Sequence, residues 1–284
     1  MKFLKIFLIV ATIAFLGYVA FIVWFGFEWA KGEERARLQR EDLRSGKEDF
    51  GGQPALFAVA QAIVRNDQEA IRAAAKEMPD LQAAGRTGKT LLYFAVGQTW
   101  HQEHKVEAVK TLLSLGADPN YNNGQEYSFA LVEAGQAAAP VLRAMLDGGG
   151  DPNGRNEEGV PLLLLNWRVS YYTDSQSRVR LDLLLDRGAD INTTMPETGW
   201  CCPGYTLLLY RTSMAFDDEN VYADALHLLE RGADPNRVAP DGMTFAKMLV
   251  AHREKFSREN KRPPPDFEPL WDWAQARTLF TAPQ

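Results

Sequence analysis

Cysteine is scarce in this chain, whose 284 residues include only two, the neighbours Cys201 and Cys202. Two adjacent thiols cannot make a disulfide framework, so the fold must be held together by packing. Neighbouring cysteines can bond to each other only through a strained ring. We therefore expect two ordinary thiols, and a redox sensor that uses this pair remains an alternative function.

The sequence also lacks the patterns that mark common catalytic and metal centres. Its four histidines include His101 and His104, which are three residues apart and could share a metal on one helical turn. No cysteine lies at a zinc-ligand spacing from them, so a solvated loop is the better interpretation. There is no Gly-x-Ser-x-Gly segment, and the acidic residues are scattered along the chain. We expect no enzyme activity, no catalytic residue and no metal.

One short segment carries part of the pattern of a nucleotide site. Residues 85–94, GRTGKTLLYF, contain the Gly-Lys-Thr that ends a phosphate-binding loop. The full loop needs a glycine five residues before Gly88 and a strand ahead of it. Ala83 occupies that position, and the preceding EAIRAAAKEMPDLQ is typical of a helix. The segment therefore predicts no nucleotide cofactor, and Lys89 is expected in a solvated turn.

Charge is absent from residues 6–27, a run of 22 mostly apolar residues. At 1.5 Å per residue, a helix of this length spans about 33 Å, which is enough to cross a bilayer. A cleaved secretory signal is the competing interpretation, but its apolar region is shorter and precedes a small-x-small cleavage site. Here the run ends in bulky Trp24, Phe25 and Phe27. We therefore predict a transmembrane anchor over residues 1–30, followed by a charged juxtamembrane stalk and hinge over residues 31–52.

The orientation of this anchor depends on the charges at its two ends. Lys2 and Lys5 precede the span, and six lysines and arginines lie between residues 31 and 47. The positive-inside rule applied to these counts favours a cytosolic body. The chain is nevertheless similar to bacterial inner-membrane proteins in which a single N-terminal anchor precedes an exported body. On that resemblance we expect a single-pass protein of the bacterial inner membrane with a periplasmic body, and the cytosolic orientation stays open.

Basic residues are in deficit over the chain as a whole. It carries 31 lysines and arginines against 37 aspartates and glutamates, a net charge of −6. Nucleic acids and anionic lipid surfaces are bound by clustered basic residues. The composition therefore predicts no nucleic-acid partner, and residues 6–27 are the only expected membrane contact. No small-molecule substrate is expected.

What the sequence does contain is a repeated phrase. LLSLGADPN ends at Asn120, MLDGGGDPN at Asn153, LLDRGADIN at Asn192 and LLERGADPN at Asn236. The spacings of 33, 39 and 44 residues indicate a solenoid of stacked units. Apolar residues at helical spacing precede each phrase, which predicts a helix there. A glycine suited to left-handed backbone follows each predicted helix, at Gly116, Gly149, Gly188 and Gly232.

A second phrase opens each unit. It reads Gly88-Lys-Thr-Leu-Leu-Tyr-Phe-Ala95 in one unit and starts at Gly159, Gly204 and Gly242 in three others. Threonine can cap a helix by accepting hydrogen bonds from free backbone N–H groups of the first turn. The phrase therefore predicts helix starts at Thr90, Thr206 and Thr244.

The two phrases and their period resemble the ankyrin repeat, whose units open with Gly-x-Thr-Pro-Leu-His-x-Ala. The histidine of that family is replaced by Tyr93, Leu164 or Leu209, so the repeats are degenerate. The resemblance implies an all-α fold, an ankyrin-repeat solenoid of about six helix-pair repeats preceded by one N-terminal transmembrane helix. The ankyrin-repeat domain is expected over residues 53–280, with repeats at about 54–84, 85–120, 121–153, 154–192, 193–236 and 237–280.

The resemblance also implies a function, because ankyrin repeats bind other proteins on the surface made by their turn tips and first helices. We expect a non-catalytic protein–protein binding module tethered to a membrane, with an unidentified protein partner on the concave face or the finger loops. Two further alternative functions are open besides the redox sensor. One is an immunity-type protein that neutralises a toxin at the inner membrane, and the other is a structural spacer or assembly factor.

Large apolar residues in the expected loops are the candidate partner-binding residues, because aromatic side chains are enriched in interface hot spots. The extended turn at residues 193–204 would place several of them near a projecting tip. For Trp200, folding back onto the neighbouring helices is an equally good interpretation. The candidates are Met195, Trp200, Cys201, Cys202, Tyr205, Tyr121, Trp100, Tyr171 and Tyr172.

Overall fold

The computed structural model describes residue 41 and residues 44–100, 102–124, 129–168, 176–197, 202–215 and 220–280. The anchor predicted over residues 1–30 and most of the predicted stalk lie outside this part of the chain. Among the described residues, no helix combines the length and the apolarity needed to cross a membrane.

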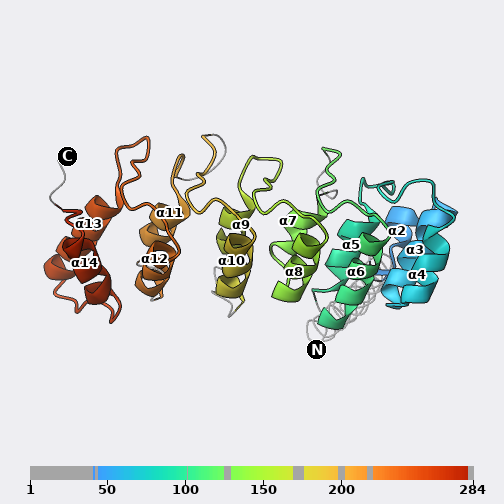
Figure 1. The fold of residues 1–284 in the computed structure, drawn as a ribbon, viewed down its shortest axis with the longest axis horizontal. Coiled ribbons are helices and arrows are strands. Elements are labelled where there is room, and N and C mark those ends of the chain that lie inside the picture. The colour runs from blue at the N-terminus through green and yellow to red at the C-terminus, as the bar shows by residue number, and fades with distance from the viewer. Residues whose placement is uncertain are drawn as a thin grey trace, which may run out of the picture.

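Helices stacked side by side in one row make up the structure (Figure 1). A short α2 (Lys47–Phe50) precedes six pairs of helices, and a 3-10 turn, η1 (Glu103–Lys105), leads into α6. The pairs are α3 (Pro54–Val64) with α4 (Gln68–Ala75), α5 (Leu91–Gln98) with α6 (Val106–Ser114), α7 (Ala130–Ala134) with α8 (Ala139–Asp147), α9 (Leu162–Arg168) with α10 (Ser177–Asp186), α11 (Leu207–Ser213) with α12 (Val221–Glu230), and α13 (Phe245–Arg258) with α14 (Phe267–Ala276). The predicted all-α stack of about six helix pairs is therefore confirmed for the described residues.

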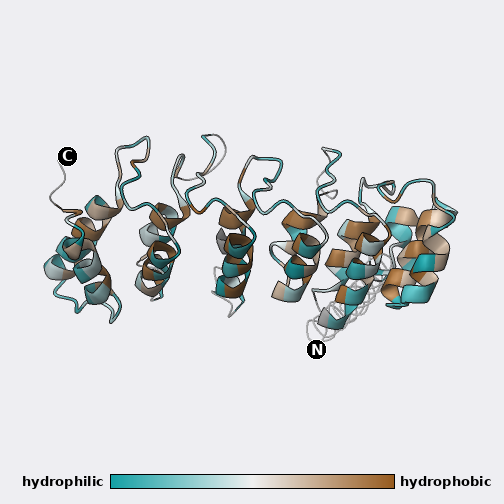
Figure 2. Cartoon of the chain, in the orientation of Figure 1, coloured by the Kyte–Doolittle hydropathy of each residue, from teal (hydrophilic) through white to brown (hydrophobic). Residues whose placement is uncertain are grey.

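A projecting turn, called a finger here, joins each pair to the next and points upward in Figure 1. Four fingers are closed at their base by an isolated antiparallel bridge, at Ala84–Thr90, Arg155–Pro161, Thr194–Thr206 and Val238–Thr244. No longer strand occurs in the described ranges. Figure 2 shows hydrophobic residues concentrated along the helices and hydrophilic residues along the fingers.

The sequence signals at the helix ends are confirmed. The side chains of Thr90, Thr206 and Thr244 accept hydrogen bonds from backbone N–H groups three residues later. The four glycines after the second helices have φ between 91° and 98°, a left-handed backbone that residues with a Cβ rarely adopt.

We expect the Thr90→Ala variant to lose about 1 kcal/mol of unfolding free energy, the usual cost of removing a helix cap. Thr90 Oγ1 accepts from the Tyr93 backbone N–H at 3.1 Å, and that donor would lose its partner. Denaturant unfolding followed by circular dichroism measures the loss. Ser257→Ala, on the exposed side of α13, serves as the control and should change stability by less than about 0.5 kcal/mol. Equal effects of the two substitutions would contradict the capping role.

The repeated Asp-x-Asn turns connect one unit to the next. Asn120 donates to the Gly149 carbonyl at 2.9 Å and accepts from the Asp151 backbone N–H at 2.7 Å. Asn153 makes the same two bonds to Gly188 and Asp190, at 3.2 and 2.8 Å. The asparagine that ends each of these phrases thus forms hydrogen bonds with a backbone carbonyl and a backbone N–H of the following turn. These bonds link successive repeats.

The environment of Lys89 differs from the one predicted from the sequence. It is not a solvated turn residue, because its side chain is only 17% exposed and its Nζ lies 2.9 Å from Asp49 Oδ2. Asp49 is in α2, at the start of the stack, and Thr87 also donates a hydrogen bond to its carboxylate. The Gly-Lys-Thr segment therefore fastens the first finger to α2.

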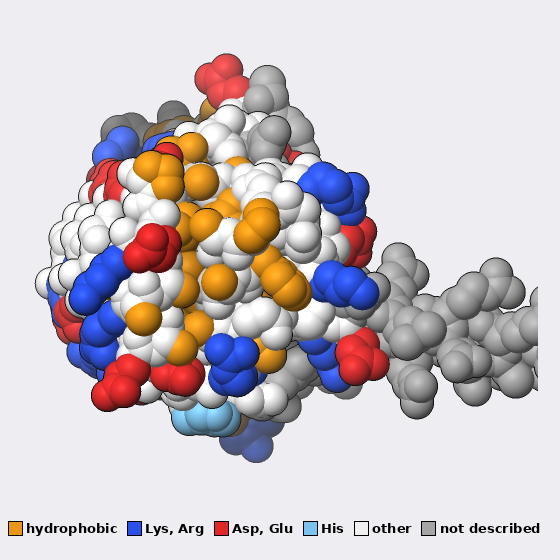
Figure 3. Space-filling model, turned by 90° about the vertical axis from the view of Figure 1, so that its right-hand side faces the viewer, with side chains coloured by type: hydrophobic (Ala, Val, Ile, Leu, Met, Phe, Trp, Pro, Cys, Tyr) orange, Lys and Arg blue, Asp and Glu red, His pale blue; other side chains and the backbone are white. Residues whose placement is uncertain are grey.

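The two ends of the stack are closed differently. Figure 3 views the N-terminal end, where hydrophobic side chains gather near the middle of the face with charged ones around them. Partly exposed apolar residues of α3 and α4 include Phe57, Val64 and Ala74. At the other end, Phe267 and Leu270 are fully buried, as expected for residues that close the stack.

The C-terminal cap also buries a histidine. His252 in α13 is 5% exposed, and its Nδ1 lies 3.3 Å from the Tyr222 hydroxyl. Burial lowers the pKa of His252 to about 4, and the nearby charge of Lys255 adds to the effect. Burial likewise raises the pKa of the Tyr222 hydroxyl. The folded cap therefore favours the neutral imidazole.

This burial predicts a loss of stability in mild acid. In the unfolded chain the imidazole takes up a proton near pH 6.5, whereas in the folded chain its pKa is about 4. Stability contributed by His252 is present above pH 6.5 and is lost as the pH falls towards 4, by about 2 kcal/mol at pH 5. Unfolding free energies at pH 7 and pH 5 measure the loss. The His252→Gln variant should lack this part of the pH dependence, and an unchanged dependence in that variant would contradict the assignment.

Candidate binding surface

A pocket of about 280 Å³ lies between two first helices and the finger at residues 151–161. It takes side chains from α5, from α7 and residues on either side of it, and from the finger at residues 151–161, so three successive repeats build it. We call it the acidic pocket, and its lining residues are Tyr93, Phe129, Val132, Glu133, Gln136, Asn156, Glu157 and Glu158.

Glu133 is held in place by two aromatic residues of the preceding repeat. The Tyr93 hydroxyl donates to Glu133 Oε2 at 3.0 Å, and Trp100 Nε1 donates to Glu133 Oε1 at 2.7 Å. Both donors are neutral, so they fix the orientation of the carboxyl group without placing a positive charge beside it. Trp100 is 45% exposed and lies beside the pocket through this bond.

The described residues that line the acidic pocket include no lysine, arginine or histidine. The basic residues of the neighbouring fingers are engaged elsewhere. Arg86 pairs with Glu48 at 3.2 Å, and Lys89 pairs with Asp49. Arg155 donates to the Gly159 carbonyl at 2.8 Å and to Thr193 Oγ1 at 3.0 Å. Three glutamates thus contribute to the lining of one hollow.

A second hollow of about 460 Å³ lies at the C-terminal end of the stack, between the last finger, α13 and residues 279–280. It is more apolar than the first, and Val238 and Val250 within it are 66% and 37% exposed. The full lining comprises Pro235, Asn236, Val238, Thr244, Ala246, Lys247, Val250, Ala251, Glu254, Leu279 and Phe280.

The turn at residues 193–204 differs from its prediction. Met195 and Tyr205 were expected near an exposed tip, but they are only 2% and 7% exposed. The Met195 backbone N–H donates to the Tyr205 carbonyl at 2.9 Å, which places both residues at the base of the finger. Their exposure was predicted wrongly, because the bridge below them returns both side chains to the core.

Tyr205 instead joins two fingers. Its hydroxyl donates to Asp241 Oδ2 at 2.8 Å. Burial, followed by this hydrogen bond, raises the pKa of Tyr205 to about 12. The pKa of Asp241 is lowered, first by the Met243 backbone N–H and then by Tyr205. The pair is a fixed structural contact between repeats.

The other predicted residues are scattered. Cys202 is partly buried and has a left-handed backbone with φ of 65°. Tyr121 is partly exposed in the finger between α6 and α7. Among the candidates that the structure describes, only Trp100 contacts the acidic pocket, through its bond to Glu133. Trp200, Cys201, Tyr171 and Tyr172 lie outside the described residues.

Sequence reasoning missed Glu133, Phe129 and the two finger glutamates of the acidic pocket. One signal was present, because Tyr93 occupies the position at which the ankyrin phrase has a histidine. A hydroxyl there can reach a carboxylate of the next repeat, as it does in this structure.

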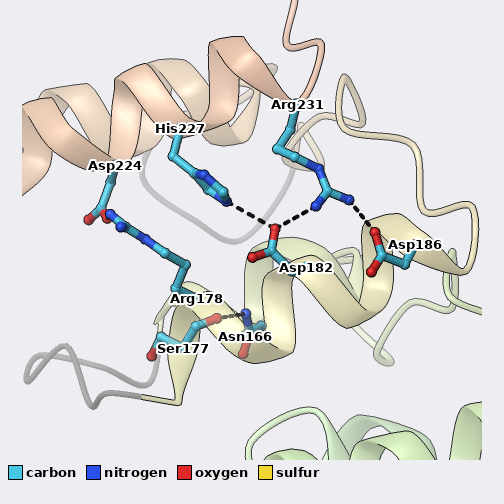
Figure 4. A network of polar contacts seen from close by, with 8 residues as sticks. All are labelled: Asn166, Ser177, Arg178, Asp182, Asp186, Asp224, His227 and Arg231. Carbon is cyan, nitrogen blue, oxygen red and sulfur yellow. Dashed lines mark hydrogen bonds and ion pairs between the residues drawn. The ribbon is translucent and has the colours of Figure 1, made fainter.

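A second polar cluster connects the second helices α10 and α12 (Figure 4). Asp182 Oδ1 lies 2.9 Å from both His227 Nε2 and an Arg231 nitrogen, and Arg231 also contacts Asp186 at 2.6 Å. Asp224 accepts from Arg178 and Arg211, each at 2.6 Å. Opposite charges neutralise one another here, so the cluster joins repeats and offers no open reactive group. Among the described residues, no group of three histidine, cysteine or acidic side chains could hold a metal ion.

Comparisons with known proteins define the class of fold. Residues 87–124 match the family model of the ankyrin repeat. The solved ankyrin-repeat protein EF0377 superimposes with a TM-score of 0.56 at 20% identity, covering 76% of this chain and 97% of that one. An ankyrin-repeat domain from Acinetobacter baumannii gives a TM-score of 0.55 at 22% identity, with the same two coverages of 76% and 97%.

A third solved structure is the ankyrin-repeat domain of Bcl-3, described as a unique member of the IkappaB protein family. It gives a TM-score of 0.52 at 21% identity, covering 72% of this chain and 86% of that one. No curated protein sequence matches the chain significantly. Together with the stacked helix pairs, these likenesses show that the chain has the ankyrin-repeat fold.

Proposed function

We propose that this chain is a non-catalytic protein-binding module, and that its partner binds the surface formed by the first helices and the fingers. We propose further that residues 6–27 anchor it in a bacterial inner membrane with the repeat domain exported. Ankyrin repeats generally serve as scaffolds for protein interaction, and a solenoid offers a long surface for that purpose.

The observation that carries the binding proposal is the arrangement around Glu133. An exposed tryptophan and a tyrosine of one repeat orient a carboxylate of the next, beside a hollow of about 280 Å³. Exposed aromatic residues fixed by their neighbours are typical anchors of protein interfaces. Because the hollow is at the lower end of the range for small-molecule sites, it suits one or two side chains of a partner.

The membrane part of the proposal is supported by the uncharged run at residues 6–27 and by the resemblance to anchored exported proteins. A tether matters physically because confinement to one surface raises the effective concentration of a binding module for partners at that surface. The two parts are independent, so each has its own test.

Binding is tested with the full chain in its native membrane after chemical crosslinking. We expect a partner that is captured by the wild type and lost with Trp100→Ala. Val179→Ala is the matched control, because Val179 is 46% exposed on α10, away from the fingers. The same set of captured proteins from all three chains would contradict the proposal.

Topology is tested with reporters fused after Gln284. An exported body predicts an active alkaline phosphatase fusion and a dark green fluorescent protein fusion. The reverse pattern would place the body in the cytosol, and recovery of both fusions in the soluble fraction would contradict the anchor.

A further inference from the structure

We infer that copies of this chain dock head to tail, with the N-terminal end of one stack seated in the C-terminal hollow of another. The C-terminal hollow is the space of about 460 Å³ between the last finger, α13 and residues 279–280. Its occupant is α3 of the second copy. The inference goes beyond the proposed binding function and is independent of it, because it concerns the two ends of the stack and not the surface beside Glu133.

The repeats inside the stack show how one unit receives the next. First helices pack in succession, with α3 against α5, α5 against α7 and α11 against α13. An inner first helix therefore uses one side for the unit before it and the other side for the unit after it. α13 has α11 on one side, and side chains from its outward face line the C-terminal hollow. The hollow thus lies where a further first helix would pack.

The C-terminal hollow has apolar surface to cover and a fixed wall. Val238 and Val250 line it and are 66% and 37% exposed. Phe280 also lines it, and its ring stacks on that of Trp271 with centroids 4.3 Å apart. The turn before Phe280 resembles the earlier turns, because the Leu279 backbone N–H donates to the carbonyl five residues back, at 3.2 Å, as the alanines after three earlier second helices do. A helix that covers the two valines would remove apolar surface from water, which favours docking.

The other half of this interface lies at the N-terminal end of the same chain. α3 has no charged residue between Pro54 and Val64. One side of it packs against α5, and the end of the stack beyond its other side carries gathered hydrophobic side chains (Figure 3). Helical spacing places Ala58 opposite the buried residues of α3, and Ala58 is exposed. Phe57 and Val64 are partly exposed. Terminal repeats ordinarily need a polar outer face, so an apolar one is suited to another repeat.

Charges on the two surfaces are complementary. Glu254 lines the hollow ten residues after the N-cap of α13, and Arg65 comes twelve residues after the N-cap of α3. Successive first helices in a repeat stack run parallel, so docking in register brings these two exposed residues to within one helical turn of the same level. Lys247, the other charged residue of the lining, donates to the Gly242 carbonyl of its own finger at 3.0 Å.

Docking of this kind has a direction. The two surfaces differ, and each copy has one of each, so copies join as a row or a ring. A symmetric pair would instead bring two hollows, or two N-terminal ends, together. The direction of the contact therefore distinguishes this inference from ordinary dimer formation.

Disulfide crosslinking between two differently tagged full-length chains in one cell tests the direction. Cys201 and Cys202 are replaced by serine in both chains, and one chain then carries Ala58→Cys and the other Val250→Cys. We expect oxidation to link these two chains, because the two positions lie at almost the same level after their N-caps. Val179→Cys in place of Val250→Cys is the matched control and should not link, since Val179 is exposed on α10, away from both ends.

The crosslinks also define the results that would overturn the inference. These are a link between two Val250→Cys chains, a link between two Ala58→Cys chains, an equal yield with the Val179→Cys control, and no link between copies. A link from Val250→Cys to a different protein, in place of the second copy, would overturn it as well.

Charge exchange is the second arm and uses the same two cysteines. Arg65→Glu in the Ala58→Cys chain should lower the yield of the link by about threefold or more, the scale of one partly exposed ion pair. Glu254→Arg in the Val250→Cys chain should act in the same way, and it keeps the test open if Arg65→Glu disturbs the first repeat. The two reversed chains together should recover the link. Arg143→Glu, on the exposed side of α8, is the control and should leave the yield unchanged. Unchanged yields in both single variants, or no recovery in the pair, would overturn the inference.

Discussion

The Asp224→Asn variant is expected to unfold at a much lower denaturant concentration than the wild type, with a loss of about 3–5 kcal/mol. Asp224 is 5% exposed in α12 and accepts from Arg211, which is 4% exposed in α11. Arg178 of the preceding repeat reaches the other carboxylate oxygen at 2.6 Å. The substitution removes the negative charge that both arginines contact, and Arg211 stays buried.

Asp147→Asn is the matched control for this prediction. Asp147 also pairs with an arginine of the next repeat, Arg187, but the two side chains are 56% and 34% exposed. Water and ions screen such a pair, so the loss should stay below about 1 kcal/mol. Denaturant unfolding of both variants, followed by circular dichroism, measures the difference. Similar losses of unfolding free energy in the two variants would contradict the prediction that burial makes the Asp224 pair more important for stability than the exposed Asp147 pair.

The Phe267→Ala variant is expected to lose about 3–5 kcal/mol, because it would empty the centre of the C-terminal cap. Phe267 is fully buried, and its ring meets those of Tyr222 and Phe256 edge to face, with centroids 5.0 and 5.3 Å apart. A terminal repeat has a neighbour on one side only, so a cavity here cannot be offset by packing from a further unit. The cap should therefore open before the rest of the stack.

Limited proteolysis and thermal unfolding together test this second prediction. We expect Phe267→Ala to be cut in the segment between α13 and α14 under conditions in which the wild type resists. Val250→Ala is the control, because Val250 is 37% exposed in α13 and its truncation should cost less than about 1 kcal/mol. A Phe267→Ala chain as resistant as the wild type would contradict the description of the cap.

The stacking of helix pairs could be predicted from the sequence because each signal is local. The glycine after four of the second helices and the threonine at three helix starts each act within a few residues of where they stand. The aspartate of each repeated turn also acts locally, because it accepts from the backbone N–H two residues later. Their period places them on successive units. Degenerate positions such as Leu164 and Leu209 did not hide this pattern, since both are fully buried apolar residues of first helices.

The candidate site could be predicted only in part, because it depends on side chains that meet across repeats. Glu133 is 40 residues from Tyr93 and 33 from Trp100. The period of the repeats does not predict which side chains of neighbouring repeats contact each other. Met195 and Tyr205 were predicted to be exposed because they lie in or next to a long turn. The Thr194–Thr206 bridge closes that turn at its base and buries both side chains.

Site-specific photo-crosslinking in the native membrane shows whether a partner protein contacts the surface beside Glu133. A photoreactive phenylalanine replaces Gln136, which lines the acidic pocket, or Val179, which is exposed on α10. We expect a specific crosslinked protein from position 136 that disappears when Trp100→Ala is added, and none from position 179. Crosslinks of equal yield from both positions, or a product at 136 that persists in the Trp100→Ala chain, would contradict the binding function.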